Sequence, residues 1–217
     1  MTLQKPPTIT CVFVDIGGVL LTDGWDRHGR QRASAQFKLD LAETEERHQR
    51  TWDTHQAGKL TLAECLGWVV FYQQRTFTQA QFRQVMFAQS KADPEMIELI
   101  RALKAQHRLK IAVVSNEGRE VNIYRTRKFR LDGFVDAFIS SCFVRLLKRD
   151  ADIFRLAQDI VQVPAERVVY IENTELYARV AEGLGIRSIR HTTYDATRAD
   201  LAAIGLLRGD CSDHAAG

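Results

Sequence analysis

Short apolar runs that end in polar residues alternate with helical periods along most of the chain. The first run, Cys11-Val12-Phe13-Val14, is rich in β-branched and aromatic side chains and is followed by Asp15 and two glycines. This pattern predicts a buried strand with a carboxylate at its tip. Similar runs predict strands over 109–114, 137–140, 168–171 and 188–191, and the stretches between them predict a helix that opens at Asp93-Pro94-Glu95 and helices over 119–128, 150–161 and 175–183. Strands that alternate with helices predict an α/β fold with a doubly wound parallel sheet.

The interval after the first strand breaks this alternation, because only helical periods are found there, over 33–37, 43–55, 60–72 and 80–88. Two helix starts are well marked, since Thr61 with Glu64 and Thr78 with Gln81 both fit the capping-box pattern. The apolar and aromatic residues of the interval are most simply the core of a small bundle. We therefore expect a core domain made of residues 1–22 and 90–217, with an inserted helical cap domain over 23–89.

Composition excludes several classes of protein. The chain has 45% hydrophobic and 26% charged residues, and no apolar run approaches the roughly 20 residues needed to cross a bilayer. We therefore expect a soluble protein with no membrane partner. No signal-peptide pattern is visible, so we expect a cytoplasmic location. A net charge of +3 on interspersed charges predicts no nucleic-acid partner. The oligomeric state is left open by the sequence.

The cysteines and histidines do not indicate a disulfide framework or a zinc site. Cys11, Cys65, Cys142 and Cys211 are far apart in the sequence, and we expect reduced thiols, with the first three packed mostly in the core. The six histidines lack the spacing of known zinc motifs.

Polar groups follow three of the predicted strands, and a lysine precedes a predicted helix. These residues are Asp15, Ser115, Asn116, Lys148, Glu172 and Asn173. The carboxyl ends of parallel strands line the crevice where ligands bind, so neighbouring strands would bring these groups together. A carboxylate that attacks phosphorus, a hydroxyl and backbone N–H groups that hold phosphoryl oxygens, and a lysine that neutralises charge are what phosphoryl transfer through an aspartyl intermediate requires.

Four segments, in order, resemble the motifs of the haloacid dehalogenase-like (HAD) hydrolase superfamily. They are residues 13–20 (FVDIGGVL), 111–116 (IAVVSN), 147–154 (LKRDADIF) and 169–173 (VYIEN). The helical insert lies between the first and second motifs, as in members with a helical cap. The resemblance implies a Rossmann-like core and a hydrolase, most simply a phosphatase with Mg²⁺ as cofactor and a small phosphorylated metabolite as substrate.

The resemblance also implies roles for individual residues. Asp15 is the nucleophile and Lys148 the charge-neutralising lysine, while Ser115, Asn116 and Gly18 hold the phosphate. Asp15, the Gly17 carbonyl, Glu172 and Asn173 are the implied ligands or orienting groups of the magnesium. Two departures weaken this assignment: Gly17 stands where a second, proton-transferring aspartate is usual, and Asn173 stands where an aspartate commonly binds the metal. A slow phosphatase is therefore expected, because general acid–base help contributes about 10²–10⁴-fold.

Two other functions stay open. The dehalogenases of the superfamily attack carbon without a metal and also lack the second aspartate, and a third possibility is a weakened binding or regulatory module. Asp23 is a possible replacement proton donor, but it lies too many residues past the strand to be preferred. Candidates for substrate contacts in or near the insert are Trp25, Asp26, Arg27, His28, Arg30, Trp52, His55 and Arg75; the hypothesis for Arg27 is that it binds a second anionic group.

Overall fold

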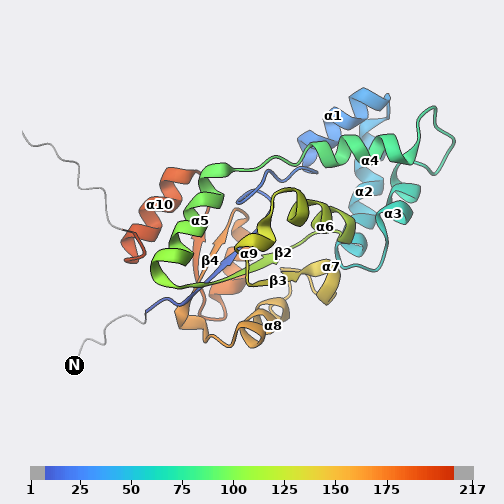
Figure 1. The fold of residues 1–217 in the computed structure, drawn as a ribbon. Coiled ribbons are helices and arrows are strands. Elements are labelled where there is room, and N and C mark those ends of the chain that lie inside the picture. The colour runs from blue at the N-terminus through green and yellow to red at the C-terminus, as the bar shows by residue number, and fades with distance from the viewer. Residues whose placement is uncertain (1–7, 208–217) are drawn as a thin grey trace, which may run out of the picture.

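A single parallel sheet of five strands forms the centre of the computed structural model, which describes residues 8–207 (Figure 1). The strands are β1 (Cys11–Val14), β2 (Lys110–Ser115), β3 (Ala137–Ser140), β4 (Val168–Glu172) and β5 (Arg187–Arg190). Their order is β3-β2-β1-β4-β5, so the chain builds outward from β1 in one direction and then crosses to the other. This reversal places a ligand crevice at the carboxyl end of β1. The predicted α/β fold class is confirmed.

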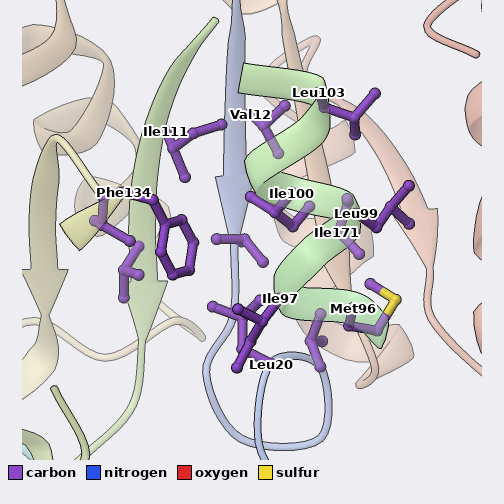
Figure 2. Close-up of a cluster of buried hydrophobic side chains, with 14 of the residues drawn as sticks. Val12, Leu20, Met96, Ile97, Leu99, Ile100, Leu103, Ile111, Phe134 and Ile171 are labelled. Atoms are coloured by element: carbon purple, nitrogen blue, oxygen red, sulfur yellow. The ribbon is translucent and has the colours of Figure 1, made fainter. Parts of the chain in front are cut away.

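Helices cover both faces of the sheet, because the side chains of each strand alternate between two hydrophobic clusters. Val12 and Val14 pack with α5 (Pro94–His107) and α10 (Tyr194–Ala203), whereas Cys11 and Phe13 pack with α8 (Asp152–Val161) and α9 (Glu175–Glu182). Figure 2 shows the apolar stripe of α5, including Ile97, Ile100 and Leu103, against the sheet. The remaining core helices are α6 (Arg119–Lys128) and α7 (Ser141–Val144), with single 3-10 turns at Leu131–Gly133 and Ala165–Arg167.

Four helices between β1 and β2 form a separate bundle at one end of the molecule (Figure 1). They are α1 (Arg27–Phe37), α2 (Leu41–Gln56), α3 (Leu62–Val69) and α4 (Gln79–Ala88). Both predicted capping boxes are present, at Thr61 with Glu64 and at Thr78 with Gln81. The bundle has its own hydrophobic cluster around Trp25, Leu66 and Phe82. This insert lies over the carboxyl end of the sheet, where its residues share a cavity with the strand tips.

Three local features differ from the sequence-based expectations. The first insert helix begins at Arg27 rather than near residue 33, because the Asp26 side chain accepts a hydrogen bond from the Gly29 N–H and caps the helix there. Helix α10 was not predicted, since only Thr197 and Leu201 of its ten residues are buried and its apolar stripe is therefore weak. Helix α3 ends at Val69, three residues earlier than expected.

The cysteines within residues 8–207 match the expectation from the sequence. Cys11, Cys65 and Cys142 are free and buried, as expected; Cys211 lies outside the described residues. Burial raises the pKa of each of these three thiols, to about 12, 11 and 12 respectively. Within this part of the chain no helix has the length and apolar character needed to cross a membrane.

Candidate active site

The strand register brings Asp15 and Glu172 to the same level of the sheet. Val14 pairs with Ile171, and Asp15 extends this ladder by donating its N–H to the Ile171 carbonyl, so the two carboxylates occupy adjacent strand tips. Both are buried, with Glu172 fully inaccessible and Asp15 5% exposed. Two neighbouring buried carboxylates repel each other, so a cation is required between them.

Lys148 supplies that cation. Its Nζ atom lies 2.6 Å from Asp15 Oδ2 and 2.7 Å from Glu172 Oε2, and its side chain is only 2% exposed. Burial opposes the charged ammonium, but the two carboxylates outweigh this effect and raise the pKa of Lys148 above its ordinary value. Removing Lys148 would leave two buried carboxylates without a cation.

Glu172 contacts Lys148 and is not part of the cavity lining. Its Oε2 atom also accepts a hydrogen bond from the Tyr170 hydroxyl, and Oε1 accepts one from the Thr174 N–H at 2.8 Å. Burial and the negative charge of Asp15 raise the pKa of Glu172, although Lys148 and Tyr170 partly oppose this shift. These contacts orient Glu172 as the group that holds Lys148 beside Asp15.

A cavity of about 220 Å³ opens between the strand tips and the insert. Its core-side wall contains six of the site residues predicted from the sequence: Asp15, Gly17, Ser115, Asn116, Lys148 and Asn173. Its other wall comes from the insert and includes Trp25, Asp26, Trp52, Gln56 and Met86. Glu172 is outside this wall, in keeping with its complete burial.

Unused hydrogen-bond donors line the same cavity as Asp15. Among residues 8–207, the backbone N–H groups of Gly17 and Asn116 and the Ser115 hydroxyl have no acceptor, and all three residues line the cavity. Hydrogen-bond donors that have no protein partner and line the cavity of a carboxylate are suited to bind an anionic ligand group. The Asn116 side chain has a supporting contact as well, because its Oδ1 accepts the Lys148 backbone N–H at 2.9 Å.

Gly18 differs from these donors. Its N–H is used within the loop, on the Leu21 carbonyl at 2.7 Å, and its φ of +76° favours glycine. A Cβ at this position would lie 2.0 Å from Asn173 Nδ2. Gly18 therefore contributes by letting Asn173 pack closely over the first loop, and its N–H is not free to contact a phosphate.

A family model for haloacid dehalogenase-like hydrolases matches residues 9–185, which include strands β1 to β4, whereas β5 lies beyond the matched range. The chain belongs to this family. The expectation of a hydrolase is thereby confirmed at the family level. The comparison with curated proteins gives no significant match.

Solved structures of other HAD proteins share the fold. A predicted HAD-like hydrolase from Porphyromonas gingivalis is 18% identical, with a TM-score of 0.73 over 90% of this chain and 98% of the other. A HAD family enzyme from Bacteroides thetaiotaomicron, solved as a magnesium complex, is 17% identical, with a TM-score of 0.73 over 86% and 94%. An L-2-haloacid dehalogenase from Xanthobacter autotrophicus, solved with chloropropionic acid covalently bound, is 15% identical, with a TM-score of 0.62 over 92% and 85%.

The oxygen donors of this HAD site suit a magnesium ion only in part. Asp15 offers a carboxylate oxygen, and Asn173 an amide oxygen, and the Gly17 carbonyl accepts no hydrogen bond among residues 8–207. No cluster of three His, Cys, Asp or Glu side chains in that span is arranged for a metal. Magnesium is commonly bound by one or two carboxylates together with waters and substrate phosphate, which matches this donor set. A cation would depend here on a phosphorylated ligand more than on protein charge.

Asp23 lies where a side chain at position 17 would project. A Cβ built on Gly17 would be 3.1 Å from Asp23 Oδ1, and both residues line the cavity. Partial desolvation of the carboxyl, together with the negative charges of Asp15 and Asp26, raises the pKa of Asp23, and Arg125 and Lys148 oppose this effect. The sequence could not favour this residue, because only the turn at residues 16–21 folds the chain back over Gly17.

Arg125 of α6 is a cavity residue that sequence reasoning missed. It is 3% exposed and forms an ion pair with buried Glu117, which also accepts a hydrogen bond from Asn122. Its other guanidinium nitrogens donate to the Asp23 carbonyl at 2.6 Å and to Ser90 Oγ at 2.9 Å. The one available signal was its spacing of four residues from apolar Val121 on the same helix.

The predicted insert contacts separate into two groups. Trp25, Asp26 and Trp52 line the cavity. The others do not: Arg27 and His28 are exposed, Arg30 pairs with Glu45, Arg75 donates to the Val70 carbonyl, and His55 is buried against Gly118. Arg27 is therefore poorly placed for the proposed contact with a second anionic group.

Proposed function

We propose that this HAD hydrolase is a phosphatase that acts on a small phosphorylated metabolite through an aspartyl-phosphate intermediate on Asp15. The observation that carries the proposal is the 2.6 Å contact between Lys148 Nζ and Asp15 Oδ2, beside three donors without a partner, at Gly17, Ser115 and Asn116. A carboxylate is a weak nucleophile, and it attacks a dianion only where the negative charge is compensated. Lys148 supplies compensation on one side and the free donors on the other.

Each residue contributes one physical effect. Glu172, Tyr170 and Asn116 fix Lys148, so the ammonium stays beside Asp15. The Ser115 hydroxyl and the N–H groups of Gly17 and Asn116 orient the phosphoryl oxygens. Asp15, the Gly17 carbonyl and Asn173 would hold Mg²⁺, which supplies charge neutralisation between phosphate and nucleophile when bound.

The size of the cavity limits the substrate. A free volume of about 220 Å³ is below the roughly 300–1,000 Å³ of pockets for drug-sized ligands. The aromatic rings of Trp25 and Trp52 form part of the insert wall, and Gln56 is the neutral polar group there. We expect a compact monophosphate.

The test is phosphate release from a panel of small monophosphates and p-nitrophenyl phosphate, with and without Mg²⁺, for wild type beside Asp15→Asn. The expected result is magnesium-dependent release that the substitution abolishes. Release equal in the two proteins would reject the proposal and leave a binding module.

A second candidate is metal-independent dehalogenation, favoured by one observation. Of the three oxygen donors proposed to hold Mg²⁺, Asp15 alone carries a negative charge, because the Gly17 donor is a backbone carbonyl and Asn173 is neutral. Halide release from 2-haloacids in the presence of a chelator, lost in Asp15→Asn, would select this activity over phosphatase activity.

A further inference from the structure

Cleavage of a phosphate ester through Asp15 requires two proton transfers that the residues described so far do not perform. The departing alcohol oxygen needs a proton, and the water that later attacks the aspartyl phosphate must lose one. Lys148 forms ion pairs with two carboxylates, which favour its charged form. It is therefore unsuited to giving up and regaining a proton in each reaction cycle. A carboxyl group that faces the cavity and has no other hydrogen-bond partner would suit both steps.

Four carboxylates line the cavity, and three of them have other partners. Asp15 is the nucleophile, Asp26 accepts the Gly29 N–H at the start of α1, and Glu117 is paired with Arg125 and Asn122. The Asp23 carboxylate forms no hydrogen bond or ion pair with any residue among 8–207. It is therefore the carboxylate of this wall that is free to contact a ligand.

The surroundings hold Asp23 in position through its backbone rather than its side chain. Arg125 donates to the Asp23 carbonyl at 2.6 Å, and the N–H of Trp25 donates to the same oxygen at 2.8 Å. The Asp23 Oδ1 atom lies 3.1 Å from the place of a Cβ on Gly17, two residues after the nucleophile. The missing side chain at position 17 leaves the space that the Asp23 carboxyl approaches.

We propose that Asp23 is the catalytic acid and base of the reaction, an inference that rests on the proposed phosphatase function. In the first step, Asp15 Oδ forms a bond to phosphorus, the ester P–O bond breaks with its electron pair on the alcohol oxygen, and that oxygen takes the proton of Asp23. In the second step, the Asp23 carboxylate takes a proton from water, the water oxygen bonds to phosphorus, and the P–O bond to Asp15 breaks. The products are alcohol and inorganic phosphate, and Asp23 is again protonated.

The experiment compares Asp23→Asn with wild type on two monophosphates that differ in their leaving group. A primary alkyl phosphate needs protonation of its leaving oxygen, whereas p-nitrophenolate leaves readily without it. We expect Asp23→Asn to lower kcat/KM by about 10²–10⁴-fold on the alkyl ester, and to change the single-turnover burst of p-nitrophenolate far less. Asp40→Asn, at an exposed helix cap where asparagine also serves, is the matched control.

A second variant moves the carboxylate rather than removing it. In Gly17→Asp/Asp23→Ala the new side chain projects into the space beside the former Asp23 carboxyl, and partial recovery on the alkyl ester is expected relative to Asp23→Ala. Equal losses on both esters, or no loss, in Asp23→Asn would overturn the role of Asp23 while leaving the phosphatase proposal intact. No difference between wild type and Asp15→Asn would overturn both.

Discussion

The imidazole of His55 in α2 occupies the space beside Gly118 at the start of α6, where a Cβ atom would lie 1.9 Å from His55 Nε2. His55 is fully buried and its Nδ1 is paired with the Leu60 carbonyl at 3.0 Å. One residue further on, Gln56 Nε2 donates to the Asn116 carbonyl. The insert is thus seated on the core next to the residues that surround Asp15.

Gly118→Ala is expected to disturb this seating. Because the buried ring has no room to yield, we expect a loss of about 1–3 kcal/mol in the free energy of unfolding, together with a higher KM as Gln56 shifts from Asn116. Urea unfolding and steady-state kinetics measure both. Gly67→Ala is the control, since nothing lies within 4 Å of a Cβ there. Wild-type stability in Gly118→Ala, or no recovery when His55→Ala is added, would contradict this account.

Gly18→Ala is expected to affect the site as well as the fold. Both Gly18 and Gly205 have positive φ, +76° and +79°, but only Gly18 has a neighbour, Asn173, in the path of a Cβ. Gly205→Ala should therefore show the backbone cost alone, roughly 1–2 kcal/mol, whereas Gly18→Ala should cost more and weaken the response to Mg²⁺ in the phosphate-release assay. Identical losses of stability in the two variants would argue against close packing of Asn173.

Arg125→Met is expected to be strongly destabilising. The substitution leaves Glu117 buried without its cation, which costs about 3–5 kcal/mol. The control is Arg50→Met, which breaks an ion pair with Glu46 between side chains that are 76% and 61% exposed and should cost at most about 1 kcal/mol. Thermal and urea unfolding give both values. A loss in Arg125→Met as small as in the control would show that Glu117 finds another partner.

Stability is expected to fall on mild acidification because of His48. Burial first, and the charge of Arg30 second, lower the pKa of this imidazole from 6.5 to about 3. The unfolded chain therefore binds more protons than the folded chain between these values, so stability is complete above pH 6.5 and decreases as the pH falls towards 3. From pH 6.5 to 5 the loss from His48 is up to roughly 2 kcal/mol.

His48→Gln tests this pH dependence by urea unfolding at pH 7 and pH 5. The variant should show a smaller difference between the two pH values than wild type, while exposed His28→Gln should show the same difference as wild type. A His48→Gln profile parallel to that of wild type would mean that other groups, such as buried His55, account for the acid sensitivity.

The strand tips were predictable from sequence because each buried apolar run ends at its first polar residue. Asp15, Ser115 and Glu172 follow this rule, and parallel pairing then brings them together. Lys148 required the family resemblance, since its contact with Asp15 joins residues 133 positions apart. Arg125 had no comparable signal: it is one of several basic residues in and after α6, and only packing turns it inward.

The guanidinium of Arg125 has a consequence for how a substrate could enter. It contacts both segments that connect the core with the insert, through the Asp23 and Thr22 carbonyls on the way out and Ser90 Oγ on the way back. Thr22 also bonds directly to Gln89 and Lys91. Both segments that connect the core with the insert are thus hydrogen-bonded to Arg125 of the core, or to each other, at the points where they leave and re-enter it. We therefore expect any rotation of the bundle that admits a substrate to occur beyond Asp23 and Ser90, which would leave the carboxyl groups of Asp15 and Asp23 in place.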